Sequence, residues 1–251
     1  MIRRDILTTY LSDYLKVSEF NDIAPNGIQV AGRSEINKII TGVSACVELF
    51  EHALTENADA IIVHHGIIWN FERPVYIGGY RERVKLLLEN NLNLYAFHLP
   101  LDAHSVVGNN AQIGKSLGIQ NMQPFGDYKG QYIGMRGEIH ALPAVDLFKK
   151  VEQVMKRELL IFPYGPEKIK HVGIISGGAQ KEITQAVTAG LDLYLTGEVS
   201  EHIMHYAKEE KIHFISAGHY VTEKFGIRAL GEHLKNKFKI DVAFVDIPNP
   251  V

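Results

Sequence analysis

The sequence has very little cysteine and no long apolar run. Its single cysteine, Cys46, excludes an internal disulfide and a cysteine-rich zinc site. The longest candidate for an apolar run, residues 60–63, leads directly into two histidines, whereas a membrane span needs about 20 apolar residues. The first seventeen residues lack the unbroken apolar stretch of a signal peptide. We therefore expect a soluble protein that stays in the cytoplasm.

A strong charge of either sign is also absent. Lys and Arg number 26 and Asp and Glu number 29, which gives a formal net charge of −3. Because no stripe of Lys and Arg stands out, the composition disfavours nucleic acid as a partner without excluding it. The motifs G-x-x-x-x-G-K-[ST], G-x-G-x-x-G and G-x-S-x-G are missing, so neither a phosphate-binding loop nor a serine-hydrolase elbow is indicated.

The residues that are present have an ordinary globular composition and an alternating pattern. Apolar residues make up 46% of the chain and charged residues 22%. The first seventeen residues predict an amphipathic helix, with Ile6 and Leu11 on its apolar face. Short β-rich runs then alternate with helical patterns over residues 38–97 and again over residues 170–219. This alternation is typical of βαβ units and predicts an α/β fold with a largely parallel sheet.

The two halves of the chain resemble each other. The segment that begins at Asp59 aligns with the one that begins at Asp192, 133 positions further on, and a His-x-x-x-carboxylate motif follows a predicted strand in each half. We therefore expect two similar, interlinked α/β domains related by internal duplication. The predicted domains are residues 1–125 and residues 126–251, with the C-terminal segment packing back on the first.

Candidate metal ligands follow three of the predicted strands. Open α/β sheets bind ligands beyond the carboxyl ends of their strands, and imidazole with carboxylate suits Zn, Fe or Mn better than Ca. A single set after one strand would be explained by polar loop residues or by chance spacing. The prediction therefore depends on the occurrence of such sets after three strands. The candidate ligands are His64, His65, His98, Asp102, His219 and Glu223.

The adjacent pair His64 and His65 favours a dinuclear centre. Neighbouring side chains of a strand point to opposite faces, so at a strand end they can reach two ions but rarely chelate one. A carboxylate such as Glu223 can bridge two ions about 3.5–4 Å apart. Shared ligands would leave each ion with open positions for water, which is typical of a catalytic site.

Other candidate residues have weaker support. Trp69 and Phe71 follow the histidine pair and could stack a planar substrate, but loop packing explains them at least as well. His202 and His205 are expected on a solvated helix face, and Cys46 is expected to pack in the core. The glycines of residues 174–180 favour a tight turn over an anion site.

Several ordered motifs together resemble a known family. They include APNGIQV (24–30), IVHHG (62–66), YAFHLPLDAH (95–104), GNNAQ (108–112), LTGEVSEH (195–202), AGHYVTEKFGIRAL (217–230) and VDIPNP (245–250). The chain resembles the Nif-three-like family, whose members are commonly called GTP cyclohydrolase I type 2 homologues. The resemblance covers residues 22–251 and corresponds to the short form without a middle insert.

The resemblance implies a dinuclear metal centre between two α/β domains, with two divalent ions (Zn, Fe or Mn) per subunit. It also implies a homohexameric ring, or toroid, whose metals face the inner cavity. The family's ligands fall on His64, His65, Asp102, His219 and Glu223. His98 lies in the HLPLD motif and is interpreted as a catalytic acid–base group or an additional weak ligand.

The expected function is that of a metal-dependent hydrolase. Two divalent ions would lower the pKa of bound water and so provide hydroxide as the nucleophile. His98 or His104 could transfer protons, because imidazole titrates near neutral pH. The substrate would be a small molecule: GTP, opened at C8 with release of formate, or a phosphoester. The alternative is a non-catalytic, metal-binding hexameric scaffold or regulatory protein.

Overall fold

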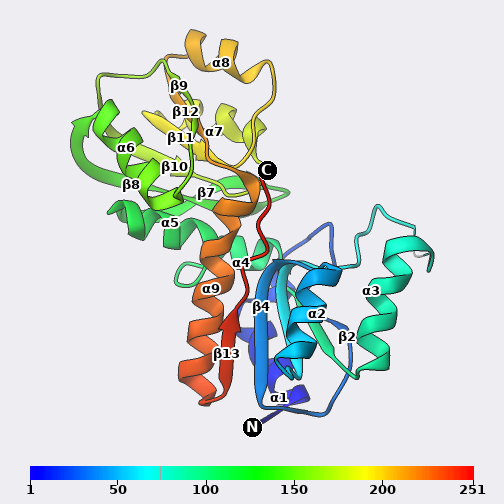
Figure 1. The fold of residues 1–251 in the computed structure, drawn as a ribbon. Coiled ribbons are helices and arrows are strands. Elements are labelled where there is room, and N and C mark those ends of the chain that lie inside the picture. The colour runs from blue at the N-terminus through cyan, green and yellow to red at the C-terminus, as the bar shows by residue number, and fades with distance from the viewer. Residues whose placement is uncertain (74) are drawn as a thin grey trace. The chain divides into compact units, whose positions relative to one another are not determined.

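The computed structural model describes residues 1–73 and 75–251, and Figure 1 shows its ribbon. The chain divides into two compact units. Unit 1 comprises Met1–Leu101 and Gly226–Pro248, and unit 2 comprises Asp102–Phe225 and Asn249–Val251. Each unit contains one large sheet with helices, so the α/β class predicted from the sequence is confirmed.

Unit 1 contains a five-stranded sheet in the order β13-β4-β5-β6-β2. Its strands are β2 (Gly27–Val30), β4 (Lys38–Ser44), β5 (Ala60–His65), β6 (Asn93–Ala96) and β13 (Asp241–Phe244). Neighbouring strands are parallel except β2, which is antiparallel to β6. The central strand β5 is buried from Ala60 to His64, which explains its nearly continuous apolar sequence. A short two-stranded ladder joins β1 (Ile2–Arg3) to β3 (Glu35–Ile36).

Helices cover both faces of this sheet. Leu49, Phe50 and Ala53 of α2 (Val47–Thr55) and Leu87 of α3 (Gly78–Glu89) pack on one face. The opposite face meets α1 (Arg4–Tyr14), whose Thr8 Oγ1 lies 2.9 Å from the Tyr95 hydroxyl of β6. The C-terminal half of α9 (His219–Phe238) lies on that face as well, since Gly231 sits against Thr41 of β4.

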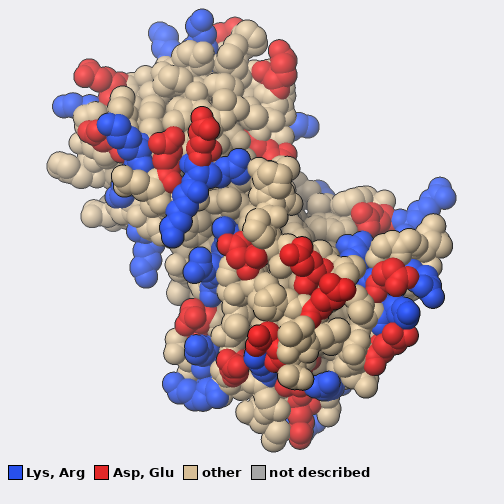
Figure 2. Space-filling view, viewed as in Figure 1, with Lys and Arg blue, Asp and Glu red and all other residues tan. Residues whose placement is uncertain are grey.

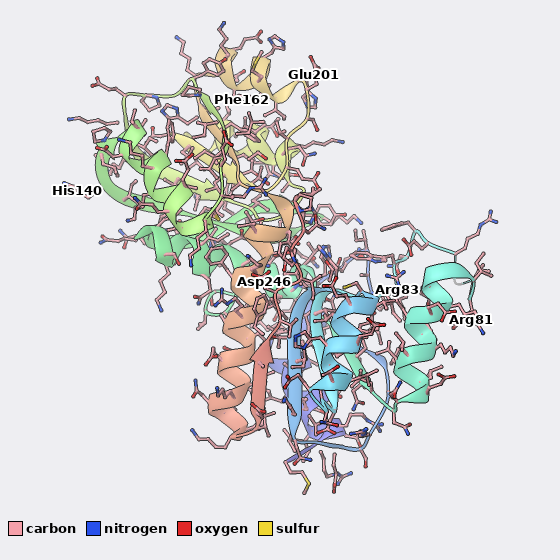
Figure 3. The ribbon with its side chains drawn as sticks, viewed as in Figure 1. Arg81, Arg83, His140, Phe162, Glu201 and Asp246 are labelled. Carbon is pink, nitrogen blue, oxygen red and sulfur yellow. The ribbon has the colours of Figure 1, made fainter. Side chains whose placement is uncertain are left out.

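Side chains on the helices show how α1 and α3 are fixed. Leu7 and Leu11 are the buried residues of α1, whereas Ile6 is 54% exposed. The predicted apolar face is therefore confirmed at Leu11 and wrong at Ile6, whose place is taken by Leu7, four positions before Leu11. On α3, Arg83 donates a hydrogen bond to the carbonyl of Ala45, while Arg81 is exposed and pairs with the neighbouring Glu82 (Figure 3).

Unit 2 contains a six-stranded sheet in the order β7-β8-β10-β11-β12-β9. Its strands are β7 (Gln120–Tyr128), β8 (Gln131–Pro143), β9 (Leu160–Pro163), β10 (Lys168–Ile174), β11 (Leu193–Thr196) and β12 (His213–Ser216). Only β10, β11 and β12 are mutually parallel. The expected parallel character therefore holds for this part of the sheet alone.

The antiparallel part of this sheet has a local cause. β7 and β8 are joined by two residues only, Lys129 and Gly130, and both have positive φ values of 54° and 84°. Such a two-residue turn closes a hairpin, whereas a parallel pair needs a long crossover. β9 is antiparallel to β12, and its Phe162 stacks on Phe214 with ring centroids 5.7 Å apart (Figure 3).

The core of unit 2 lies between the sheet and two helices. Ile113 and Leu117 of α5 (Asn109–Leu117) pack with Leu147 and Val151 of α6 (Ala144–Met155) against the central strands. The shorter helices α7 (Ile183–Thr188) and α8 (Ile203–Glu209) contact β11 and β9. Short 3-10 turns at Val17–Glu19 and Gln180–Glu182 complete the regular structure together with α4 (Leu99–Ala103).

The compact units have different bounds from the domains expected at residues 1–125 and 126–251. Residues 102–125 belong to unit 2 because Ile113, Leu117 and Ile119 are part of its core. Residues 226–248 belong to unit 1, where β13 pairs with β4. The chain therefore passes from one unit to the other within α4 and again within α9.

One hydrogen-bond pattern recurs in both units. In unit 1, Asp59 Oδ2 accepts hydrogen bonds from the backbone N–H groups of Asn37 and Lys38, at 2.8 and 3.1 Å. In unit 2, Asp192 Oδ2 accepts from the N–H groups of Lys170 and His171, at 2.8 and 2.7 Å. Each aspartate thus binds two consecutive backbone N–H groups at or within the strand before it, and the aspartates and both donors are related by the same shift of 133 residues.

Candidate metal centre

Three histidines of unit 1 gather where two parallel strands end. His64 and His65 are the last residues of β5, and His98 follows the neighbouring strand β6. One ring nitrogen of each lies within 4.8 Å of the others, and His64 is fully buried. The ring centroid of His64 lies 4.7 Å from that of His65 and 5.1 Å from that of His98. The expectation that the two adjacent histidines point apart is therefore wrong, because their rings stack and turn towards one place. Together with His98 they form a cluster that could hold a metal ion.

Hydrogen bonds to Nδ1 orient each ring of this cluster. His64 Nδ1 lies 2.8 Å from the carbonyl oxygen of Phe97, which only accepts, so Nδ1 carries the hydrogen. His65 Nδ1 lies 3.2 Å from the hydroxyl of Ser44, and His98 Nδ1 lies 2.8 Å from Asp22 Oδ1. A partner at Nδ1 fixes the ring and makes Nε2 the nitrogen that can bind an ion.

Asp22 is a site residue that the sequence reasoning missed. Its side chain is 2% exposed and also accepts hydrogen bonds from the N–H of Leu99 and from the Asn26 amide. Burial alone would raise the pKa of Asp22, but the hydrogen bond and charge of His98 and the other donors outweigh it and lower the pKa to about 2. No spacing signal points to this pair, because the two residues lie 76 positions apart.

Unit 2 brings together an imidazole and two carboxylates. His219 and Glu223 stand on the first turns of α9, four positions apart, where side chains share a face. His219 Nε2 lies 3.1 Å from Glu223 Oε1. A carboxylate oxygen of Asp102 lies within 4.8 Å of one of Glu223. Both carboxylates are buried, with residue exposures of 6% for Asp102 and 2% for Glu223.

Neighbouring polar groups hold this set in place. Asp102 Oδ1 accepts hydrogen bonds of 2.8 Å from the hydroxyl of Ser176 and from the amide of Asn109. His219 Nδ1 lies 2.6 Å from Glu198 Oε1. Burial lowers the pKa of His219, but its contacts with Glu223 and Glu198 outweigh that effect and raise the pKa to about 9.

Glu198 is a second residue that the sequence reasoning passed over, although a signal exists. The shift of 133 residues that relates the two halves places Glu198 opposite His65. Glu198, which follows β11, therefore orients the imidazole of His219. The end of β5, by contrast, supplies the imidazoles of His64 and His65 themselves.

The glycine turn after β10 makes room for these side chains. Gly177 has a φ of +69°, and a Cβ built there would lie 2.3 Å from Glu223 Oε1 and 3.2 Å from His219 Nε2. The turn thus approaches a carboxylate, which disfavours an anion at this place and agrees with the tight-turn interpretation.

Other sequence candidates have structural roles. His104 Nδ1 accepts hydrogen bonds from the N–H groups of Val106 and Val107 and so shapes the turn before α5. His202 and His205 are exposed at α8, as expected for a solvated face. Cys46 is half-buried and packs at the edge of the unit 1 core.

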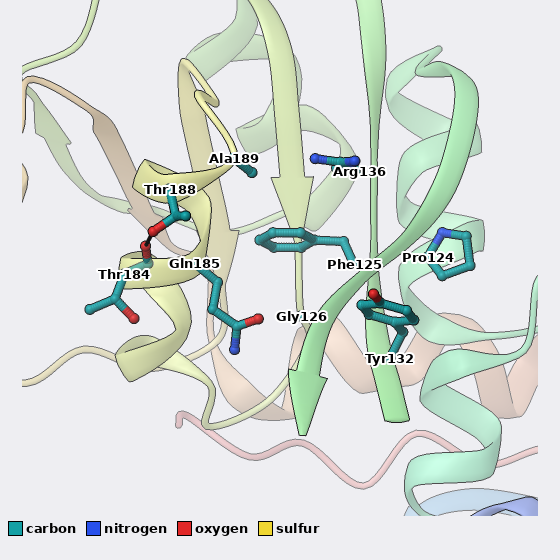
Figure 4. Close-up of a pocket in the computed structure, with 9 residues that line it drawn as sticks. All are labelled: Pro124, Phe125, Gly126, Tyr132, Arg136, Thr184, Gln185, Thr188 and Ala189. Atoms are coloured by element: carbon teal, nitrogen blue, oxygen red, sulfur yellow. Dashed lines mark hydrogen bonds between the residues drawn. The ribbon is translucent and has the colours of Figure 1, made fainter. Parts of the chain in front are cut away.

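A separate pocket of about 330 Å³ lies on the sheet of unit 2, between the β7–β8 hairpin and α7 (Figure 4). Phe125, Tyr132 and Arg136 line it together with Gln185 and Thr188. None of the predicted site residues lines this pocket, so the candidate metal centre is distinct from it.

Two surface properties bear on partners. Figure 2 shows acidic and basic side chains interspersed over the visible face, in keeping with the small net charge of −3. Among the described residues, none of the helices has the length and apolarity required to cross a membrane.

Comparison with known proteins shows what the chain is similar to. The model of the Duf34/NIF3 (NGG1p interacting factor 3) family matches residues 1–250. A Haemophilus influenzae protein named GTP cyclohydrolase 1 type 2 homolog is 46% identical over 247 residues, which cover 97% of this chain and 98% of that protein. An Escherichia coli protein of the same name is 43% identical over 246 residues, with 97% and 98% coverage.

Solved structures show the same likeness. The structure of TTHA1606 from Thermus thermophilus is 32% identical, with a TM-score of 0.92 and 100% of both chains covered. A structure of protein ybgI, described as of unknown function, is 41% identical, with a TM-score of 0.94 and full coverage of both chains. The chain belongs to the Duf34/NIF3 family, in agreement with the family resemblance found in its sequence motifs.

Proposed function

We propose that the protein is a dinuclear-metal-dependent hydrolase. The proposed ligands are His64, His65, Asp102, His219 and Glu223. The observation that carries this proposal is the gathering of ring nitrogens of two proposed ligands, His64 and His65, and of the proposed acid–base group His98 within 4.8 Å in unit 1. A matching imidazole and carboxylate set in unit 2 supports it.

The donor set fits divalent Zn, Fe or Mn. Imidazole nitrogen with carboxylate oxygen is the ligand chemistry that these ions prefer, and no thiolate is needed. The Nδ1 hydrogen bonds of His64, His65 and His219 direct Nε2 as the binding atom in each ring. The absence of a side chain at Gly177 leaves room beside Glu223 and His219.

Each residue would have a defined part in hydrolysis. When bound by these residues, two divalent ions would supply an acidified water and would stabilise negative charge in the transition state. His98 would accept or return a proton at Nε2, because Asp22 holds its Nδ1. Ser176 and Asn109 would keep Asp102 in a fixed orientation. The alternative role of His98 is that of an additional weak metal ligand.

The substrate proposed first is GTP or a related nucleotide. The curated relatives carry the name GTP cyclohydrolase 1 type 2 homolog, which supports GTP as the first substrate to test. Opening of the purine ring at C8 would release formate. A phosphoester is the other substrate class, because paired ions can hold an attacking and a leaving oxygen equally well.

Further parts of the proposal concern the whole chain. We infer that the two units arose by internal duplication, which the recurring Asp59 and Asp192 contacts support. We also propose a homohexameric ring in the cytoplasm, as the family resemblance implies. Light scattering of the purified protein would test the ring, since a hexamer has six times the mass of the 28.1 kDa chain.

A metal and turnover assay tests the function. Elemental analysis should find two divalent ions per chain, and a panel of nucleotides and phosphoesters with Mn, Fe, Zn or Mg should reveal hydrolysis. Glu223→Ala should abolish turnover while assembly and circular dichroism stay unchanged. Glu232→Ala, on the same helix but outside the site, is the matched control and should keep full activity.

Two results would reject the proposal. Turnover that persists at full rate in metal-free protein would exclude metal-dependent hydrolysis. Metal binding without turnover of any substrate, together with capture of a protein partner, would favour the non-catalytic scaffold instead.

A further inference from the structure

The segment after β5 carries aromatic side chains that continue outward from the histidine cluster. Trp69 lies beside the imidazoles, with its ring centroid 5.8 Å from that of His65 and 5.5 Å from that of His98. Phe71 follows at 5.7 Å from Trp69, with 30° between the ring planes. These rings form a continuous row, which we call the aromatic row, from the buried cluster to solvent.

Core packing does not explain the outer end of this row. Phe71 is 70% exposed, and Trp69 is only partly buried. Neither residue belongs to the hydrophobic core of unit 1. In this stretch of the chain, the last residues that pack in that core are Ile67 and Ile68. The loop-packing interpretation therefore accounts neither for the exposure of Phe71 nor for the contact of Trp69 with the imidazoles.

Backbone contacts hold the row in position before any ligand arrives. The N–H of Ile67 donates to Gln29 Oε1 at 2.8 Å, and the N–H of Asn70 donates to the carbonyl of Ile23 at 2.9 Å. The N–H of Glu72 donates to the carbonyl of Trp69 at 3.1 Å. These contacts fix the backbone that carries the row, which lowers the entropy that the segment would lose on binding a ligand.

We infer that the aromatic row is a subsite for a planar heteroaromatic ring on the substrate of the histidine cluster. An exposed aromatic face attracts a flat ring by stacking, whatever the identity of the base. Phe71 lies two ring contacts from His98, so a ring on Phe71 and Trp69 leaves an attached anionic group within reach of the cluster. Of the two proposed substrate classes, this placement favours a nucleotide phosphoester over ring opening at C8. This inference depends on the proposed function for the identity of the reacting group.

The protein carries its own reporter for this subsite. Trp69 is the single tryptophan of the chain, so tryptophan fluorescence comes from this position alone. Guanosine 5′-monophosphate should change the Trp69 emission in a saturable way, whereas ribose 5-phosphate, which has the same anion without the base, should not. Each titration is carried out with the full-length protein in metal-free and metal-loaded form.

Substitutions separate the aromatic row from its surroundings. Phe71→Leu should weaken binding of guanosine 5′-monophosphate about tenfold, as expected for the loss of one stacking contact. Tyr76→Leu is the matched control, because Tyr76 is 60% exposed and its ring contacts Tyr80 instead. It should leave the affinity within twofold. Circular dichroism of both variants checks that they fold.

The outcomes distinguish this inference from the proposed function. Equal affinities for guanosine 5′-monophosphate and ribose 5-phosphate, or equal losses in Phe71→Leu and Tyr76→Leu, would overturn the subsite even if hydrolysis occurs. Base-selective emission changes that depend on Phe71 would support the subsite even if the metal-loaded protein hydrolyses nothing.

Discussion

At the scale of single residues, the hydrogen-bond partner of each candidate histidine decides which ring nitrogen can bind an ion. Imidazole can bind an ion through either ring nitrogen, and the partner of the other nitrogen selects which one. Asp22 makes this selection for His98, and Glu198 makes it for His219. Both acidic residues lie outside the six ligand candidates read from the sequence, so the ligand list alone describes only part of the site.

Glu198 is therefore expected to act as a positioning residue for metal binding. Glu198→Ala should weaken metal affinity about 10–100-fold, because the ring of His219 loses the partner at Nδ1. Glu198→Gln, which keeps an oxygen acceptor, should restore part of that loss. Competition with a chelator measures the affinity, and Glu201→Ala, an exposed change on the same segment, is the control. Equal affinities in all variants would contradict the role.

At the scale of elements, strand ends and the turns after them position the candidate ligands. The strands β5 and β6 end side by side, so parallel pairing alone brings His64, His65 and His98 to one edge. A different histidine, His213 at the start of β12, fastens a turn. Its Nδ1 accepts from the N–H of Gly165, and its Nε2 donates to the carbonyl of Pro166.

This arrangement predicts a pH dependence of stability. Burial lowers the pKa of His213 below its usual 6.5, so the folded state binds a proton less readily than the unfolded chain. Stability should thus be highest above about pH 6.5 and fall as the pH decreases from there towards the lower, folded-state pKa. Below that pKa, both states are protonated and the contribution is constant.

Urea unfolding at several pH values tests this dependence. His213→Phe removes the titrating group, so it should lower stability at neutral pH through two lost hydrogen bonds but flatten the decline below pH 6.5. The same change at His140, which is exposed on β8 (Figure 3), is the control and should leave the slope unchanged. An unchanged slope in His213→Phe would contradict the assignment.

At the scale of the whole molecule, the chain is organised as one nearly continuous unit and one that is interrupted. Unit 2 needs residues 102–225 with only three residues from the C-terminus, whereas unit 1 combines residues 1–101 with residues 226–248. Two elements, α4 and α9, contribute residues to both units.

Fragments should reflect this organisation. A fragment of residues 102–225 should fold with a cooperative urea transition, because it contains the complete core of unit 2. A fragment of residues 126–251 should not, since it lacks Ile113, Leu117 and Ile119. Removal of three such core side chains costs several kcal/mol, comparable with the stability of a domain. Cooperative unfolding of both fragments would contradict the unit boundaries.

The amino-acid sequence by itself determined the α/β class, the family and the strand ends where the candidate ligands lie. These features are local, because apolar runs, helical spacing and short motifs such as IVHHG can be recognised without knowledge of distant contacts. The family match confirms the motif reading, while the roles of the individual ligands stay predictions.

Only the tertiary structure decided which distant residues complete each set. Asp22 meets His98 across 76 positions, and Asp102 meets Ser176 across 74. Contacts at such separation depend on how elements pack, and neither periodicity nor motif spacing encodes them. The exposure of Phe71 belongs to the same class, because solvent access is a property of the folded chain.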